Sequence, residues 1–90
     1  EQPSDASLVH SLFPNPMSGR STISFTLDKP GSVSVSIADV MGREVGRVAQ
    51  GFFPQGRSQL SFPTDQLSPG AYFVLVAAGE QTGSIPTIHR

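Results

Sequence analysis

Two stretches of the chain alternate strictly between apolar and polar residues. Residues 22–27 carry an apolar side chain at every second position, and residues 32–37 do the same with serines between. The apolar positions are Ile23, Phe25, Leu27, Val33, Val35 and Ile37. A period of two places such side chains on one face of a β-strand, whereas a helix would scatter them around its axis. The alternation therefore predicts two half-buried strands, joined by a turn at residues 28–31.

Turn-forming residues divide the rest of the chain into short segments. There are 9 glycines and 8 prolines among 90 residues, so turns are frequent and long helices are not expected. Asp39 suits the start of a tight hairpin turn in which Gly42 takes a positive φ. Residues 44–49 should return from that turn as a bulged or edge strand. Residues 51–56 are predicted to form a loop, and residues 64–70 a corner with room for one helical turn.

The last two segments predict a central strand followed by an edge. Residues 71–78 are apolar on both faces and rich in β-branched and aromatic side chains, which favours a strand inside a sheet. Residues 81–90 contain Pro86, which has no N–H to donate to a sheet ladder. This last segment is therefore expected to be an edge strand or a frayed end.

Together these segments predict an all-β fold, a single immunoglobulin-like antiparallel β-sandwich of about seven short strands over residues 8–90. The polar, proline-containing residues 1–7 are interpreted as the remnant of a linker, in a module cut from a longer protein. The chain has no Cys and no Trp, so the likeness to immunoglobulin domains is one of architecture only. The residues expected to be buried are Ile23, Phe25, Leu27, Val33, Val35, Ile37, Leu60, Phe62, Tyr72, Val74 and Val76.

No pattern in the sequence predicts catalysis, a cofactor site or a metal site. No serine lies in G-x-S-x-G, and no glycine-rich phosphate loop is present. Asp28, Asp39 and Asp65 are best explained by turn formation, and no D-x-D-x-D loop for calcium exists. His10 and His89 lie near opposite ends of the chain and are expected to be surface residues on terminal strands rather than metal ligands.

Charge and aromatic content argue against several kinds of partner. The net charge is −1 with only six basic residues, so no nucleic-acid surface is expected. No apolar run approaches the roughly 20 residues that span a bilayer, so direct membrane insertion is not expected. Carbohydrate binding is not expected either, because Trp is absent and Tyr72 lies in the most apolar segment. Phe52 and Phe53 remain, and one of them is expected to pack under the loop.

Three ordered motifs resemble those of one family, the C-terminal sorting domain of the type IX (Por) secretion system. Residues 12–19 resemble its Y/F-P-N-P-x-x-G box, residues 35–45 its V-x-I-x-D-x-x-G-R-x-V hairpin, and residues 67–76 its L-x-x-G-x-Y-x-L/V-x-V box. The matching positions are Pro14, Asn15, Pro16, Gly19, Asp39, Gly42, Arg43, Gly70 and Tyr72. The order and spacing agree over residues 12–78.

The resemblance implies a non-catalytic module that carries its parent protein across the outer membrane, to the cell surface or the medium via the periplasm. It implies no cofactor. The implied partners are outer-membrane translocon components and a sortase-like peptidase that cuts within residues 1–7 and links the cargo to lipopolysaccharide. The family usually ends in a strand with a basic residue and a Val/Ile run. Here Ile85, Ile88 and Arg90 are the candidates for that recognition strand, which Pro86 interrupts.

An alternative function also fits the hairpin motif. The related immunoglobulin-like domain of flagellar hook-capping proteins and bacterial glycoside hydrolases shares the pattern of residues 35–43. The module would then be a passive spacer or an accessory module of a secreted multidomain enzyme. For the sorting function, a near-neutral sheet rich in Ser and Thr with an open edge permits docking by strand pairing, expected at the terminal strand and its neighbouring edge.

Overall fold

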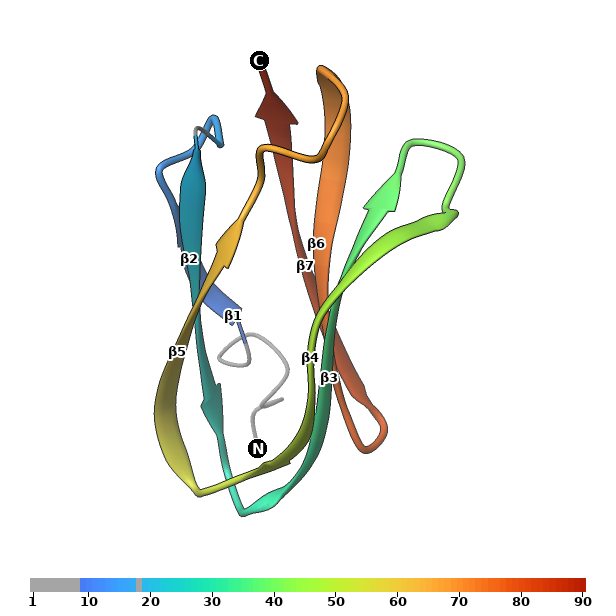
Figure 1. Cartoon of the computed structure of the whole chain (residues 1–90). Coiled ribbons are helices and arrows are strands. Elements are labelled where there is room, and N and C mark those ends of the chain that lie inside the picture. The colour runs from blue at the N-terminus through green and yellow to red at the C-terminus, as the bar shows by residue number, and fades with distance from the viewer. Residues whose placement is uncertain (1–8, 18) are drawn as a thin grey trace.

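The chain folds into two antiparallel β-sheets that face each other across one apolar core (Figure 1). A computed structural model describes residues 9–17 and 19–90. The linker predicted at residues 1–7 lies outside the described residues, and so does the side chain of His10. The described part of the chain holds seven strands and no helix. No helix long and apolar enough to cross a membrane occurs there.

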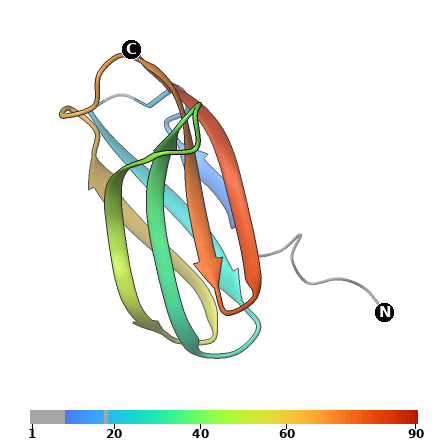
Figure 2. The same cartoon turned by 90° about the vertical axis from the view of Figure 1, so that its right-hand side faces the viewer.

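The seven strands follow the sequence segments in order. They are β1 (Val9–Phe13), β2 (Arg20–Leu27), β3 (Gly31–Asp39), β4 (Glu44–Phe53), β5 (Gly56–Pro63), β6 (Gly70–Ala78) and β7 (Gln81–His89). One sheet has the order β1-β2-β5 and the other the order β4-β3-β6-β7. Figure 2 shows the two layers from the side, with all strands running along the long axis of a domain that measures 39 × 22 × 19 Å. The predicted all-β sandwich is confirmed.

The core lies between the sheets and is built by the alternating positions. Phe25, Val35, Val74 and Val76 are fully buried at its centre, and Met17 closes it at one end. Every residue predicted to be buried is buried except Leu60, which is half-buried because β5 is an edge strand. The other face carries serines and threonines in β2 and β3, although Ser24 is buried, whereas in β6 it carries Ala71, Phe73 and Leu75. The alternation therefore sets the inner face of the strands as expected.

The predicted loop at residues 51–56 is wrong. β4 continues to Phe53, β5 begins at Gly56, and only two residues connect them. The strand is held because Phe53 pairs with Gly31 and its ring contacts Phe25 edge-on, with centroids 5.5 Å apart. Phe53 is half-buried and Phe52 is 74% exposed, so the expectation that one phenylalanine packs and the other does not is confirmed.

β4 and β6 occupy the kinds of position in the sheet that the sequence predicts. β4 is an edge strand with two register shifts against β3, as expected of a bulged return strand. β6 lies between β3 and β7 and is therefore a central strand. Residues 64–70 form a turn closed by a hydrogen bond from the Leu67 N–H to the Thr64 carbonyl at 3.1 Å, without a helix.

The terminal strand is an ordered edge. β7 pairs with β6 along its whole length, and Pro86 lies opposite Phe73. Both peptide bonds that precede Pro14 and Pro16 are cis. The turn that contains them brings Met17 beside His89 in an isolated parallel bridge, which joins the end of β7 to the loop between β1 and β2.

Candidate functional site

The three motifs that are far apart in the sequence meet at one end of the sandwich. The turn of residues 14–19, the β3–β4 hairpin at residues 39–43 and the segment 67–72 before and within β6 all lie at the end where β7 finishes (Figures 1 and 2). We call these three segments the motif end. The turns β2–β3, β4–β5 and β6–β7 lie at the opposite end.

Asn15 links the first motif to the terminal strand. Its Oδ1 accepts a hydrogen bond from the Thr87 hydroxyl at 2.8 Å, and its Nδ2 donates to the Pro86 carbonyl at 3.3 Å. Two residues later the Met17 N–H donates to the Ile88 carbonyl at 2.8 Å. Because these bonds use carbonyls on the outer side of β7, the turn occupies the edge of that strand from Pro86 onward. Asn15 therefore holds the turn between β1 and β2 against β7 and so links the two sheets.

Asp39 organises the hairpin that carries the second motif. Its Oδ1 accepts the N–H groups of Met41 at 2.9 Å and Arg43 at 3.0 Å, and its Oδ2 accepts the Arg43 guanidinium at 3.1 and 3.2 Å. The Gly42 N–H donates to the Asp39 carbonyl at 2.9 Å. Gly42 has φ 84°, in the left-handed region that a Cβ disfavours, as the turn prediction required.

The charge state of Asp39 is set by this hairpin. The hydrogen bond from the Arg43 backbone is the largest cause and lowers the pKa of Asp39 from its ordinary value of 3.8. Desolvation opposes this shift, while the Arg43 guanidinium and the Met41 N–H lower the pKa further. A hydrogen-bonded carboxylate with a lowered pKa is suited to holding a turn in shape and is a poor proton donor at neutral pH.

Tyr72 supplies the corner of the third motif. The side chain is 8% exposed, and its hydroxyl donates to the Ser68 carbonyl four residues earlier at 2.5 Å. Gly70 lies between the two partners at the start of β6. A buried tyrosine that bonds back to the loop before its strand is the corner device of many Greek-key sandwiches. Tyr72 is therefore part of the core, as predicted, and unavailable for stacking on a sugar.

Three polar residues of this end were missed by the sequence analysis. Thr64 is fully buried and bonds the Gly19 carbonyl through both its N–H at 2.8 Å and its hydroxyl at 2.9 Å. Thr87 is buried against Asn15. His89 is 8% exposed with no hydrogen-bond partner for Nδ1, so the prediction of a surface histidine is wrong. It lies on the inner face of β7, beside Met17, and the alternation of β7 places it there.

The candidate recognition residues do not form one surface. Ile85 is half-buried against the core, Ile88 is 53% exposed on the other face of β7, and Arg90 is exposed beyond the end of the strand. Ile88 borders a shallow apolar hollow on the outer face of the four-stranded sheet. The hollow is lined chiefly by Pro16, Ala71, Phe73, Pro86 and Ile88.

Among the described residues, no group of His, Cys, Asp or Glu side chains at the motif end or elsewhere could hold a metal ion. The side chains of Asn15, Asp39 and Tyr72 bond to backbone groups and hold the turns and strand ends of the motif end in place. The chain matches the family described as secretion system C-terminal sorting domain over residues 11–88. The chain belongs to this family. No curated protein sequence is detectably similar to it.

Family membership gives the sorting domain its general function. Domains of this family are signals for the type IX secretion system, so this domain directs the protein that carries it across the outer membrane, to the medium or the cell surface. The match begins within β1 and ends within β7, and therefore includes all three motifs and both sheets. The resemblance inferred from the three motifs is confirmed.

Proposed function

We propose that this sorting domain is a non-catalytic, folded label that components of the outer-membrane translocon recognise in the periplasm. The observation that carries the proposal is the family match over residues 11–88, which covers the folded sandwich rather than one short peptide. The hydrogen bonds of Asn15, Asp39 and Tyr72 support it, because they give the module one fixed shape for a partner to recognise.

We further propose that a sortase-like peptidase cuts within residues 1–7 and attaches the released protein to the cell surface. This segment is polar and contains Pro3, and it precedes the first described strand, which begins at Val9. A cut there would fall before every strand that the structure describes. Replacing residues 1–7 by a glycine-serine linker of equal length should then leave export intact and abolish the cut, seen as a mass difference in the exported protein. Cutting that persists at the same place would contradict this step.

The export function is tested by fusing residues 1–90 to a periplasmic reporter in a host with the type IX translocon. The intact fusion should reach the medium or the cell surface. A fusion that lacks residues 81–90 should stay in the periplasm, but β7 pairs with the whole of β6, so this deletion damages the fold as well as any signal. Point variants that keep the fold are therefore the sharper controls. If the intact fusion stays in the periplasm, the sorting function fails and the spacer alternative replaces it.

A further inference from the structure

The four edge strands of the sandwich differ in what their outer edges can bind. β7 is covered from Pro86 onward by the turn that contains Asn15 and Met17. β4 has two register shifts against β3, and the five-residue β1 has one against β2. Bulges and short lengths are devices that keep an edge from pairing. β5 is not covered, short or bulged, since all eight of its residues pair with β2 without a shift, and only its last residue, Pro63, lacks an N–H on the open side.

The direction of the β5 backbone groups follows from one hydrogen bond. The Thr64 N–H donates to the Gly19 carbonyl at 2.8 Å, which makes these two residues a hydrogen-bonded pair at the end of the β2–β5 ladder. Such pairs alternate along an antiparallel ladder. Arg57, Gln59 and Ser61 therefore point their N–H and C=O groups away from β2. Among the described residues, no strand pairs with β5 on that side.

The side chains beside this edge have two different characters. Arg57, Gln59 and Ser61 are exposed on the outer face of the sheet. On the inner face Leu60 is only half-buried and packs against the core. An added strand would therefore meet polar neighbours on one face and apolar neighbours on the other.

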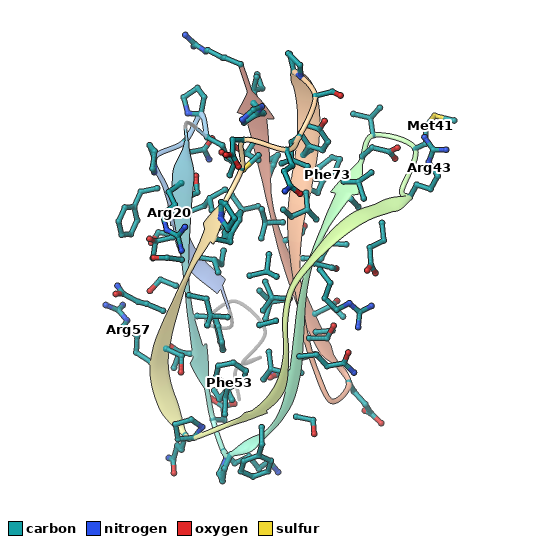
Figure 3. All side chains as sticks on the ribbon, in the orientation of Figure 1. Arg20, Met41, Arg43, Phe53, Arg57 and Phe73 are labelled. Atoms are coloured by element: carbon teal, nitrogen blue, oxygen red, sulfur yellow. The ribbon has the colours of Figure 1, made fainter. Side chains whose placement is uncertain are left out.

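The charge of the three-stranded sheet restricts the partner further. Its strands contain Arg20 and Arg57 but no Asp or Glu. Neither arginine forms an ion pair with a described residue, and Figure 3 shows Arg57 extending away from the sandwich. On the other sheet, by contrast, Arg43 pairs with Asp39 and Arg47 with Glu44. The uncompensated charge beside the open edge is positive.

We propose that the outer edge of β5 is the docking site for an extended strand of the secretion machinery. The strand hydrogen-bonds to Arg57, Gln59 and Ser61, places an apolar side chain over Leu60, and carries an acidic residue next to Arg57. This proposal rests on the proposed function, because it names the surface by which the folded label is read. Backbone pairing supplies affinity and the alternating side chains supply specificity.

A second copy of this chain is a poorer occupant of the same edge. Pairing of β5 with β5 of another molecule would bring two sheets together that each carry Arg20 and Arg57 without a carboxylate. Two sheets of like charge brought edge to edge repel each other. The partner strand is therefore expected to come from a different protein.

The test uses the reporter fusion with two matched proline variants. Gln59→Pro removes an N–H on the outer edge of β5 and places a ring there, while the ladder to β2 keeps its bonds. Ser84→Pro makes the same change on β7, where the position also faces outward because it alternates with Pro86 and Ile88. Gln59→Pro should lower export by about tenfold, the effect of a lost hydrogen bond and a steric clash together. Ser84→Pro should leave export unchanged.

The outcomes separate the docking site from the sorting function. If Ser84→Pro lowers export and Gln59→Pro does not, the β5 site is overturned and docking is assigned to β7. Export unchanged by both variants would overturn strand addition while the sorting function stands. Failure of the intact fusion to leave the periplasm concerns the function alone. A circular dichroism melt of each purified domain shows whether the variant is folded.

A charge variant keeps the proposal testable if Gln59→Pro does not fold. Arg57→Glu changes only an exposed side chain and should lower export severalfold, whereas Arg57→Lys should retain it because the positive charge remains. Equal export of the two Arg57 variants would overturn the proposal that the partner strand carries an acidic residue next to Arg57. A strong self-association of the purified domain that Gln59→Pro abolishes would instead assign the edge to a second copy and overturn the proposed partner.

Discussion

The motif end and the open edge of β5 use their polar groups in opposite ways. At the motif end Asn15, Asp39 and Tyr72 all bond to backbone groups within the domain. At the β5 edge the backbone groups of Gln59 and Ser61 point away from β2, on a side where no described strand pairs with them. The comparison teaches that a motif shared with a family can be shared because the fold needs it. The surface that meets a partner can lie on strands with no motif residue.

The largest expected loss of stability comes from a change in the core, on which both the motif end and β5 depend. Phe25 is fully buried between the sheets and contacts Phe53, so Phe25→Ala should lower the free energy of unfolding by about 3–5 kcal/mol through lost burial and the cavity left behind. For a domain of this size that is a large part of the total stability. Urea denaturation followed by circular dichroism measures it. A loss below about 1 kcal/mol would show that the core is not continuous between the two sheets.

Loss of the Asn15 hydrogen bonds at the motif end should lower the free energy of unfolding less than a cavity in the core does, but more than a change at the β5 edge. Asn15→Ala leaves the Thr87 hydroxyl and the Pro86 carbonyl without their partner, and Thr87 is buried. We expect a loss of about 1–3 kcal/mol in the free energy of unfolding. Hydrogen exchange should show faster opening of the amides at the end of β7, while β5 is unaffected. Uniform exchange in the two strands would mean that Asn15 does not fasten β7 locally.

The parts that sequence could predict are those with a local signal. The inner residues of β2, β3 and β6 follow from period-two alternation, and the Asp39 hairpin from turn chemistry between neighbours. Thr64 and Thr87 bond to partners 45 and 72 residues away. Nothing in their own neighbourhood marks them, because Thr64 lies in the turn after β5 and Thr87 in a strand with polar residues on both faces.

The same reasoning explains the two errors at the strand ends. The end of β4 was missed because Phe53 is held by a ring contact with Phe25, which belongs to the other sheet. His89 was expected at the surface because it lies on a terminal strand, although it follows the inward positions of β7. The open edge of β5 was also beyond sequence reasoning, since strand order, unlike strand position, depends on which segments pair across the whole chain.

Acid should weaken the motif end and not the β5 edge. The pKa of Asp39 is lower in the folded domain than its ordinary value of 3.8. The ionised carboxylate therefore stabilises the fold above that value, and this contribution is lost as the pH falls through the lower, folded pKa. Thermal melts between about pH 6 and about pH 2.5 should show a steeper loss of stability for the native domain than for Asp39→Asn. Parallel pH profiles would mean that the Asp39 turn contributes nothing to the acid sensitivity.

The smallest effect on stability is expected from Gln59 at the β5 edge. A small effect there would agree with an edge that makes no contacts within the domain. Gln59 is exposed, and no described strand pairs with its outer side, so Gln59→Ala should change the free energy of unfolding by no more than about 0.5 kcal/mol. Thr22 and Ser61, whose hydroxyls lie 2.9 Å apart on the outer face of the same sheet, provide the matched comparison. Ser61→Ala removes that contact and should cost about 0.5–1.5 kcal/mol. Chemical denaturation of both variants decides the point. If Gln59→Ala destabilised the domain more than Ser61→Ala, the β5 edge would already make stabilising contacts within the domain. The proposal that it is an open docking edge would then lose its basis.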